Sequence, residues 1–261
     1  MKEINVKECH RFLLEIAQIF HNLCVENGIP YYMLGGTQLG AIRHHGFVPW
    51  DDDMDFGVPR EYYVKLLDVL KMKLPSNYVI HCLDDDDDYC YGYAKLEDAN
   101  TVIKECGRAG LTFGVNIDIF PLDHTNNNIA FSSKNHCINF LTKIQVYRFL
   151  NLDSISRFRN ILRRCLIILT SFLNKRSIPI FIEKHLVKNK GDFWANHYGA
   201  WGMKEIISKN IFGVPTIYEF AGIKLYGVEK PDDYLKHLYG NYMELPSEDK
   251  RHLHIEHLYL R

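Results

Sequence analysis

Two carboxylates alternate with apolar side chains in the run PWDDDMDFG, which spans residues 49–57. Asp53 and Asp55 are separated by Met54, and Phe56 follows them. Alternate side chains of a β-strand share one face, so both carboxylates would point together while their neighbours enter a core. Adjacent carboxylates repel each other unless a cation lies between them, and Mg²⁺ prefers oxygen ligands. The spacing therefore predicts a divalent-metal site.

A glycine pair, Gly35 and Gly36, precedes this run and could form a phosphate-binding turn. Glycine lets backbone N–H groups approach a phosphate closely, because no Cβ stands in the way. The segment VNIDIF at 115–120 alternates in the same manner and puts Asp118 between two isoleucines. We expect Asp118 to be a third inward carboxylate. A buried Asp that accepts only backbone hydrogen bonds is the alternative. Together these residues predict a phosphate-transfer site.

The elements that must position these residues follow from apolar periodicity. Residues 8–26 have the helical period, and 29–34 form a short apolar run that we expect to be a strand. Thr37 is expected to cap a helix to about residue 44. A second strand over 53–58 and a helix from Pro59 come next. Further strands are expected at 78–83, 91–96, 101–105, 115–120 and near 206, 216 and 223, and a helix at 231–239.

The composition changes after residue 128, where the chain becomes basic and helical in pattern. Residues 129–190 contain a dozen Lys and Arg residues, and their only acidic residues are Asp153 and Glu183. An ordinary helical unit with a solvated basic face is one interpretation. Because the apolar segment 166–173 directly follows Arg163 and Arg164, contact with an anionic membrane or a lipid-linked substrate is the other.

Bulk properties exclude several classes of protein. The 261 residues are 47 % hydrophobic and 24 % charged, as in ordinary globular proteins, and the net charge of −1 gives no global field for nucleic acid. Seven scattered cysteines without a CxxC pair argue against a zinc knuckle and a disulfide scaffold. The start of the chain shows no secretion signal, and no apolar run reaches the length of a membrane span. We therefore expect a cytoplasmic protein.

The stretch from Tyr32 to Gly57, YMLGGTQLGAIRHHGFVPWDDDMDFG, resembles the LicD family of phosphocholine transferases and the fukutin-related ribitol-phosphate transferases. Other segments agree with the same pattern. They are KLED at 95–98, IDIFPLD at 117–123, EKPDDYL at 229–235, LYG at 238–240 and the histidine-rich tail. The resemblance spans most of the chain and is weakest in the helical stretch.

This resemblance implies an α+β fold with a nucleotidyltransferase-like core, a small mixed sheet flanked by helices, plus a helical segment. It implies a catalytic core at 1–128, a basic helical subdomain at 129–200 and C-terminal strands and a helix at 201–261 that complete the active-site region. Matched onto this chain, the catalytic residues are Asp53, Asp55 and Asp118. The same three and Asp51 would hold Mg²⁺ or Mn²⁺, although Asp51 could instead stabilise the loop after Pro49.

For the substrate, the resemblance implies a CDP-linked alcohol as donor and a glycan or lipid-linked glycan as acceptor. An acceptor hydroxyl would attack the phosphorus that carries the alcohol and expel CMP, with Asp118 drawing the proton. The residues expected to bind substrate are Gly35, Gly36, Thr37, Arg43, Lys95 and His252, with Arg43 and Lys95 as phosphate clamps.

Alternatives remain open at this point. An NTP-dependent nucleotidyltransferase acting on a small molecule or glycan would share the fold, and it would release pyrophosphate. A catalytically inactive binding module is disfavoured because all three carboxylate positions are filled. Arg43 could be a solvated helix charge, and the tail histidines could lie on a solvated terminal helix. We expect no nucleic-acid partner, and a peripheral contact at the inner face of a membrane is the localisation that the basic stretch favours.

Overall fold

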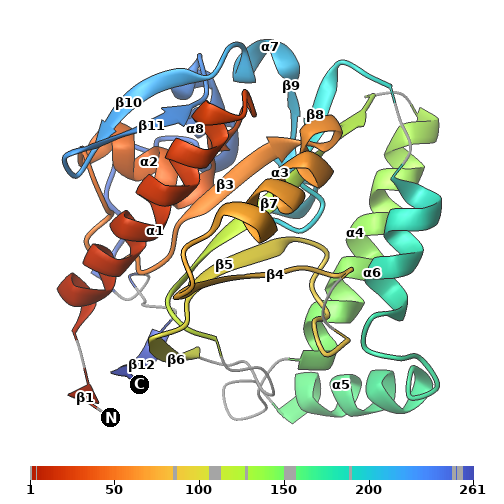
Figure 1. Cartoon of the computed structure of the whole chain (residues 1–261). Helices are drawn as coiled ribbons and strands as arrows, with labels where there is room; N and C mark the ends of the chain where they lie inside the picture. Colours follow the sequence, from red (N-terminus) through yellow and green to blue (C-terminus); the bar gives the residue numbers. More distant parts are fainter. Residues whose placement is uncertain are drawn as a thin grey trace.

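A mixed β-sheet forms the centre of the protein, and helices lie on both of its faces (Figure 1). The computed structural model describes residues 2–3, 5–84, 87–105, 113–126, 129–149, 157–187, 190–248, 251 and 255–261. Within them the strand order is β2 (Tyr32–Met33), β3 (Asp55–Pro59), β7 (Asn116–Thr125), β5 (Ala94–Asp98) and β4 (Tyr78–His81). The C-terminal end of β7 also pairs with β8 (Phe193–Ala195), and β8 in turn pairs with β9 (Ile206–Ser208). β3 runs parallel to β7, and the other pairs are antiparallel.

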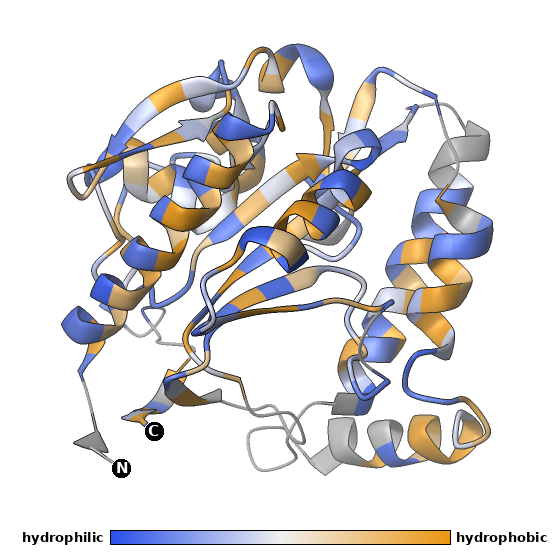
Figure 2. Cartoon of the chain, in the orientation of Figure 1, coloured by the Kyte–Doolittle hydropathy of each residue, from blue (hydrophilic) through white to orange (hydrophobic). Residues whose placement is uncertain are grey.

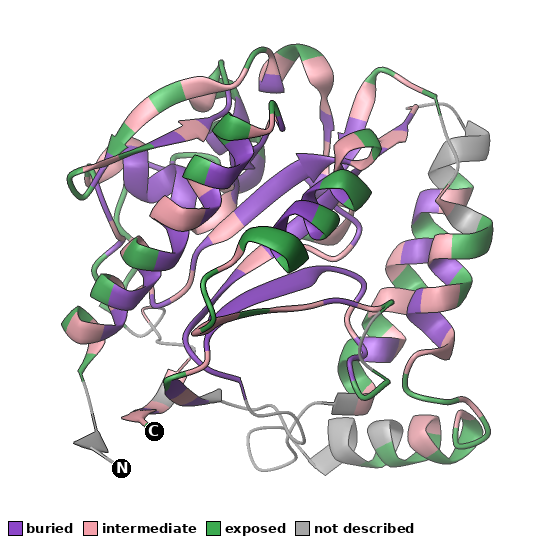
Figure 3. Ribbon diagram, viewed as in Figure 1, coloured by how far each residue is buried: buried purple, intermediate pink, exposed green. Residues whose placement is uncertain are grey.

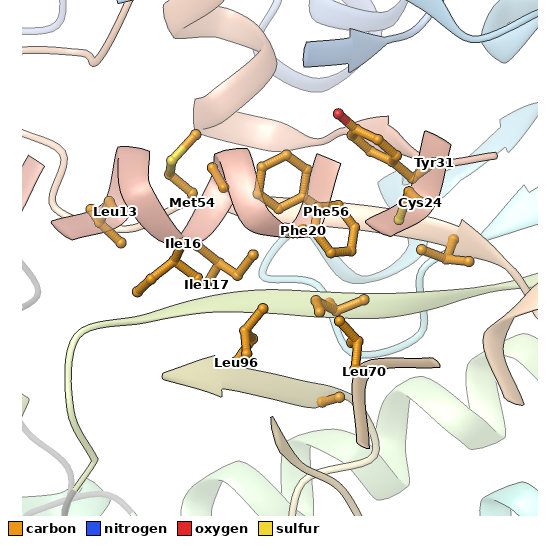
Figure 4. Close-up of a cluster of buried hydrophobic side chains, with 14 of the residues drawn as sticks. Leu13, Ile16, Phe20, Cys24, Tyr31, Met54, Phe56, Leu70, Leu96 and Ile117 are labelled. Carbon is orange, nitrogen blue, oxygen red and sulfur yellow. The ribbon is translucent and has the colours of Figure 1, made fainter. Parts of the chain in front are cut away.

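Helices α1 (Val6–Glu26) and α3 (Arg60–Lys73) cover one face of this sheet. The Asn5 side chain and Glu8 form a capping box that starts α1. The apolar side of α1 faces the sheet and its polar side faces outward (Figure 2). Phe20 of α1 packs against Phe56 of β3, with ring centroids 4.9 Å apart, at the centre of the main core (Figure 4). Burial of these side chains is the main favourable term in folding.

The opposite face of the sheet carries a second core. It is covered by α2 (Gly35–Arg43) and α8 (Pro231–Tyr239). The hairpin of β10 (Thr216–Phe220) and β11 (Ile223–Gly227) packs against α1, β2 and α2, and its Phe220 and Leu225 belong to the main core. Short α7 (Lys209–Phe212) and the 3₁₀ turn η3 (Gly202–Glu205) complete this side. Leu235 and Leu238 of α8 belong to the same apolar cluster as Phe120 and Leu122 of β7. The sheet is therefore buried on both faces near its centre (Figure 3).

A helical segment stands beside the sheet (Figure 1). It consists of α4 (Ile129–Phe149), α5 (Arg157–Leu169), α6 (Ser177–Phe181) and the π-helical turn η2 (Ile182–Leu186). Ile138 of α4 packs with Ile178 and Ile182 in a small core of its own. α5 contacts α4 and runs across one end of the segment. In the described parts of the chain, no helix has both the length and the apolar character to cross a membrane.

A small three-stranded sheet ties the two ends of the chain together. Its order is β1 (Lys2–Glu3), β12 (Ile255–Leu260) and β6 (Thr101–Glu105). The carboxylate of Asp52 accepts a hydrogen bond from the Ile255 N–H at 2.8 Å, so the acidic run is fastened to the start of β12. The side chain of Asp52 is buried, unlike those of its acidic neighbours.

The expected α+β class is confirmed, and most predicted elements lie within a few residues of the observed ones. One local prediction is wrong: Thr37 does not cap a helix, because α2 begins at Gly35 with Leu34 as its N-cap residue. The expected helices at 129–190 are present as α4, α5, α6 and η2. The predicted helical subdomain at 129–200 also contains the strand β8, which pairs with β7 of the sheet. The domain boundaries stay predictions.

Candidate active site

Three neighbouring strands bring Asp55, Asp118 and Lys95 to one level of the sheet. In the parallel pair β3–β7, Asp55 lies opposite Asp118, and in the antiparallel pair β5–β7, Lys95 lies opposite the same residue. Residues that pair across strands point to the same face. The Lys95 Nζ donates to Asp118 Oδ1 at 2.6 Å and to Asn116 Oδ1 at 3.0 Å. Because side chains alternate along a strand, Phe56 next to Asp55, and Ile117 and Ile119 on either side of Asp118, enter the main core on the other face.

The glycine turn lies directly against two of the carboxylates. Gly35 has a φ of +47°, a left-handed conformation that other residues adopt only with strain. A Cβ on Gly35 would lie 3.6 Å from Asp55 Oδ2, and one on Gly36 would lie 2.4 Å from Asp51 Oδ2. A side chain at position 36 would therefore displace the Asp51 carboxylate. The Gly35 N–H donates to the hydroxyl of Tyr234 at 3.0 Å, which fixes the turn onto α8.

Thr37 holds Asp55 in place. Its hydroxyl accepts a hydrogen bond from the backbone N–H of Asp55 at 2.8 Å, and its side chain is buried. Thr37 is not among the residues that line the cavity described below. This contact gives Thr37 a positioning role between α2 and β3, and its predicted contact with a substrate stays a prediction.

A large open cavity of about 1260 Å³ lies over these residues. Its walls come from the glycine turn, the acidic run, the strands β5 and β7, helix α4, the loop 196–202 and the segment after α8. The following predicted site residues line it: Gly35, Gly36, Arg43, Asp51, Asp53, Asp55, Lys95 and Asp118. The structure thus assembles in one cavity residues that are up to 83 positions apart in the sequence, from Gly35 to Asp118.

Burial and neighbouring negative charge raise the pKa of Asp55 well above its usual value. Burial is the larger cause, and the carboxylates of Asp53, Asp118 and Asp51 add repulsion. Among the described residues, no three His, Cys, Asp or Glu side chains form a complete metal-binding group. Mg²⁺ commonly uses one or two carboxylates and takes its remaining ligands from water and substrate phosphates. The donor set of Asp53 and Asp55 fits such a partial site, and a cation there would offset the repulsion around Asp55.

Arg43 and Lys95, the two predicted phosphate clamps, both reach the cavity from well-anchored positions. Arg43 donates from Nη1 to the carbonyl of Tyr242 at 2.6 Å and from Nε to His44 at 2.9 Å. Partial burial lowers the pKa of Arg43. The Lys95 ammonium is almost fully buried and lies 5.6 Å from the ring centroid of Tyr93. Their side chains are therefore held at the wall before any ligand arrives.

Sequence reasoning missed the wall opposite the acidic strands. Glu205 is buried there, accepts from the Trp201 N–H at 3.2 Å and from Asn196 Nδ2 at 3.3 Å, and has a pKa raised to about 7 by burial. The rings of Trp201 and Tyr239 meet edge to face, with centroids 5.1 Å apart. Tyr239 lies in the LYG segment already singled out, but no local pattern marks Glu205 or Trp201.

His252 lies outside the described residues, so its predicted contact with substrate stays a prediction. Arg251 is described, and its guanidinium lies 4.8 Å from the ring centroid of Trp50 at the cavity wall. Arg251 of the basic tail therefore lies beside Trp50, the residue that directly precedes the acidic run.

Comparison with known proteins agrees with this geometry. The family model of the LicD/FKTN/FKRP nucleotidyltransferase domain matches residues 28–145, which include the glycine turn, Asp51, Asp53, Asp55 and Asp118. The lipopolysaccharide cholinephosphotransferase LicD of Haemophilus influenzae is 30 % identical over 270 residues, covering 100 % of both chains. Human ribitol 5-phosphate transferase FKRP is 40 % identical over 50 residues, which is 19 % of this chain and 10 % of FKRP. An uncharacterized protein of Rickettsia prowazekii, RP689, is 40 % identical over 68 residues, 26 % of each chain. The chain therefore belongs to the LicD family and is a transferase of that family.

Proposed function

We propose that this protein moves phosphocholine, or a similar phospho-alcohol, from a CDP-linked donor to a hydroxyl group of a cell-surface glycan and releases CMP. The names of two relatives support the class of reaction, because one is a lipopolysaccharide cholinephosphotransferase and the other a ribitol 5-phosphate transferase. The observation that carries the proposal is the alignment of Asp55, Asp118 and Lys95 across three strands beside the glycine turn.

The donor diphosphate would bind at the glycine turn. Helix α2 begins at Gly35, so its positive dipole end lies where an anion would approach, while the Gly35 N–H itself donates to Tyr234. Arg43 and Lys95 would add charge-assisted hydrogen bonds from the same cavity. These groups neutralise the diphosphate and fix its orientation for attack from the opposite side.

Asp53 and Asp55 would hold Mg²⁺ or Mn²⁺, with Asp51 and Asp118 close by. When bound, such an ion supplies positive charge against the phosphate oxygens. The protein's own residues then divide the remaining tasks. The hydroxyl oxygen of the acceptor forms a bond to the phosphorus that bears the alcohol, and the bond from that phosphorus to the CMP oxygen breaks. Asp118 accepts the hydroxyl proton, and Lys95 holds Asp118 in position for this step.

The aromatic corner of Trp201 and Tyr239 favours a cationic alcohol such as choline. Two rings that meet edge to face offer electron-rich surfaces to a quaternary ammonium group. The buried carboxyl of Glu205 lies next to them and would add negative charge when ionised. Ribitol or glycerol would use the many hydrogen-bonding groups of the cavity instead, so the choice of alcohol is a direct question for experiment.

The acceptor in this proposal is a hydroxyl of a lipopolysaccharide, capsule or teichoic acid glycan, free or linked to a lipid. A lipid-linked acceptor would be met at the inner face of a membrane, which is where we expect a peripheral contact of the protein. The cavity has room for both substrates, because its volume of about 1260 Å³ exceeds the range of about 300–1,000 Å³ that is usual for small-molecule pockets.

Incubation of the purified protein with a panel of CDP-alcohols tests the proposal. The panel contains CDP-choline, CDP-ethanolamine, CDP-ribitol and CDP-glycerol, each with Mg²⁺ and with lipopolysaccharide or a teichoic acid as acceptor. CMP release is measured by chromatography. We expect CMP from at least one donor, and no CMP after a chelator removes the metal. Full activity in the presence of chelator contradicts the metal assignment.

The NTP-dependent alternative is decided in the same assay. A nucleotidyltransferase would release pyrophosphate from an NTP and leave CDP-alcohols intact. If the protein releases pyrophosphate from CTP or another NTP and releases no CMP from any CDP-alcohol, it is a nucleotidyltransferase and the proposed reaction is wrong.

A further inference from the structure

Helix α5 leaves an apolar stripe uncovered along its length. Among the described side chains, Ile161 is 61 % exposed, Ile168 71 %, Leu169 73 % and Phe172 81 %, and Cys165 is exposed as well. In chain order, the first four of these positions follow the spacing of one helical face, and Phe172 lies in the turn directly after the helix. The backbone coils on past Leu169, since the Thr170 N–H donates to the carbonyl of Leu166 at 3.0 Å. We call these five residues the α5 stripe.

The α5 stripe is separate from the face that packs inward. α5 contacts α4, and Leu173 after it belongs to the small core of the helical segment. The helix therefore has one side engaged in folding, and its apolar stripe serves no packing role in the described chain. Monomeric proteins rarely expose contiguous apolar surface of this kind without a binding function.

The segment that contains the α5 stripe carries charges of a single sign in its own sequence. Residues 154–182 contain six basic side chains and no Asp or Glu; they are Arg157, Arg159, Arg163, Arg164, Lys175 and Arg176. Arg164 is exposed, and its position lies between those of Ile161 and Ile168 at the edge of the stripe. Arg176 pairs with Asp87 and thereby anchors the chain after the helix. A helix that combines an apolar face with basic flanks is typical of an element that lies in the interface of an anionic membrane.

We propose that the α5 stripe docks on the surface of an anionic lipid bilayer, with Ile168, Leu169 and Phe172 entering the headgroup region. The charge pattern argues against a second copy of this chain as the occupant, because two such segments would bring like charges together. It favours a surface rich in phosphate headgroups, whose negative potential attracts basic segments near it.

Docking of α5 would also bring the active site near the membrane. The helix α4, on which α5 packs, lines the cavity with Thr142, Lys143, Val146 and Tyr147. Val146 and Tyr147 are themselves partly exposed. An acceptor held by a lipid could therefore reach the cavity along α4. The docking itself does not depend on the proposed transfer, so it is tested without any donor.

The test is co-flotation of the purified full chain with vesicles of phosphatidylcholine alone or with phosphatidylglycerol as the anionic component. We expect binding to the anionic vesicles that is at least about tenfold stronger than to the neutral ones and that weakens as salt rises. The double variant Ile168→Ser/Phe172→Ser should lose at least about tenfold in the binding constant, because it removes two apolar side chains from the docking face.

The matched control is Val64→Ser/Met72→Ser on α3, since these side chains are 64 % and 74 % exposed on a helix whose basic residues alternate with the acidic Glu61 and Asp68. This control should bind as the wild type does. For charge, Arg164→Glu should weaken binding severalfold, and Lys224→Glu, the same charge change on exposed β11, should weaken it less. Circular dichroism confirms that each variant is folded.

Three results would overturn the proposal. The first is equal binding of the wild type and of Ile168→Ser/Phe172→Ser, and the second is no binding of the wild type to anionic vesicles. The third is a wild-type dimer in light scattering that Ile168→Ser/Phe172→Ser converts to a monomer, because the α5 stripe would then be an interface between copies.

Discussion

Asp55 is the residue on which the chemistry of the site converges. It lies on β3 opposite Asp118, touches the glycine turn and has its N–H bound by Thr37. Its raised pKa reflects burial among like charges, an arrangement that costs folding energy and is therefore typical of a functional site. The protein keeps this carboxylate where a purely structural site would place a neutral side chain.

Replacement of this carboxylate by an amide should separate catalysis from folding. We expect Asp55→Asn to lower kcat by roughly 10³-fold, equivalent to about 4 kcal/mol of transition-state stabilisation, since an amide cannot balance a divalent cation. The free energy of unfolding should stay the same or rise, because the amide removes repulsion with Asp53 and Asp118. CMP release and urea unfolding measure the two effects. Asp233→Asn, on the exposed side of α8, is the control and should change neither.

A substitution at Thr37 tests whether its hydroxyl positions Asp55. Thr37→Val keeps the shape of the side chain but removes the hydroxyl that accepts the Asp55 N–H. A backbone donor left without its partner costs about 1–3 kcal/mol of stability, and Asp55 should lose its fixed position. Thr37→Ser retains the hydroxyl and should remain close to wild type in both unfolding and kcat. Equal behaviour of the Val and Ser variants would show that the hydrogen bond has no such role.

The local alternation of side chains was sufficient to predict Asp53, Asp55 and Asp118 as candidates. The side chains of Asp55 and Asp118 point away from the main core because a strand has a period of two, whereas Asp53 lies in the irregular segment just before β3. The hydrogen bond of Thr37 could not be predicted in this way. Its partner is the backbone of a residue 18 positions later, and no pattern around Thr37 indicates that contact.

At the scale of elements, the loop 196–202 and the turn η3 form the wall that faces the acidic strands. Glu205 organises this loop, because its carboxyl accepts hydrogen bonds from the Trp201 N–H and from Asn196. A Cβ on Gly199 would lie 2.3 Å from Glu205 Oε1, so the loop approaches the carboxyl closely. The position of Trp201 at the cavity therefore depends on Glu205.

The stability of the protein should depend on pH through Glu205. Burial raises its pKa from 4.5 to about 7 in the folded state, so the folded protein retains a proton that the unfolded chain releases. The free energy of unfolding should therefore fall as pH rises from about 4.5 to about 7, by about 3 kcal/mol in total. Glu205→Gln should lack this decline and be the more stable protein at pH 8, with little difference at pH 4. Urea unfolding at both pH values measures it.

The control for this effect is Glu219→Gln on the exposed side of β10, which should leave the pH profile unchanged. A Glu205→Gln variant with the same decline between pH 4.5 and 7 as the wild type would assign the dependence to other groups.

Element prediction succeeded where the segment itself carries the period, as in α1 and α8. It did not find β8, a three-residue strand whose position is fixed by pairing with the end of β7. It also left the tail undecided between strand and helix, and β12 forms because β1 and β6 offer free edges on either side. Such strands arise from tertiary pairing, because their local sequence is too short to show a pattern.

At the scale of the whole molecule, a partly buried ionic bridge joins the helical segment to the sheet. Arg60 of α3 donates to both oxygens of Asp123 on β7, at 2.6 and 3.1 Å, and to both oxygens of Glu183 on η2, at 2.9 and 3.1 Å. Asp123 is 1 % exposed, so its charge depends on this guanidinium. The sequence alone could not reveal this bridge, because its members lie 63 and 123 positions apart.

Removal of the guanidinium should therefore loosen the molecule as a whole. We expect Arg60→Met to lower the free energy of unfolding by about 3–5 kcal/mol, because Asp123 would remain buried without a counter-ion. Adding Asp123→Asn in the same chain should recover a large part of the loss, since the neutral amide carries no uncompensated charge. Urea unfolding measures both changes, and hydrogen exchange in 177–186 reports whether η2 detaches first. Arg60→Lys is the matched control: it keeps the charge but cannot bind two carboxylates bidentately, so its loss should be smaller. A loss below about 1 kcal/mol in Arg60→Met, or no recovery in the double variant, would mean that apolar packing alone holds the helical segment to the sheet.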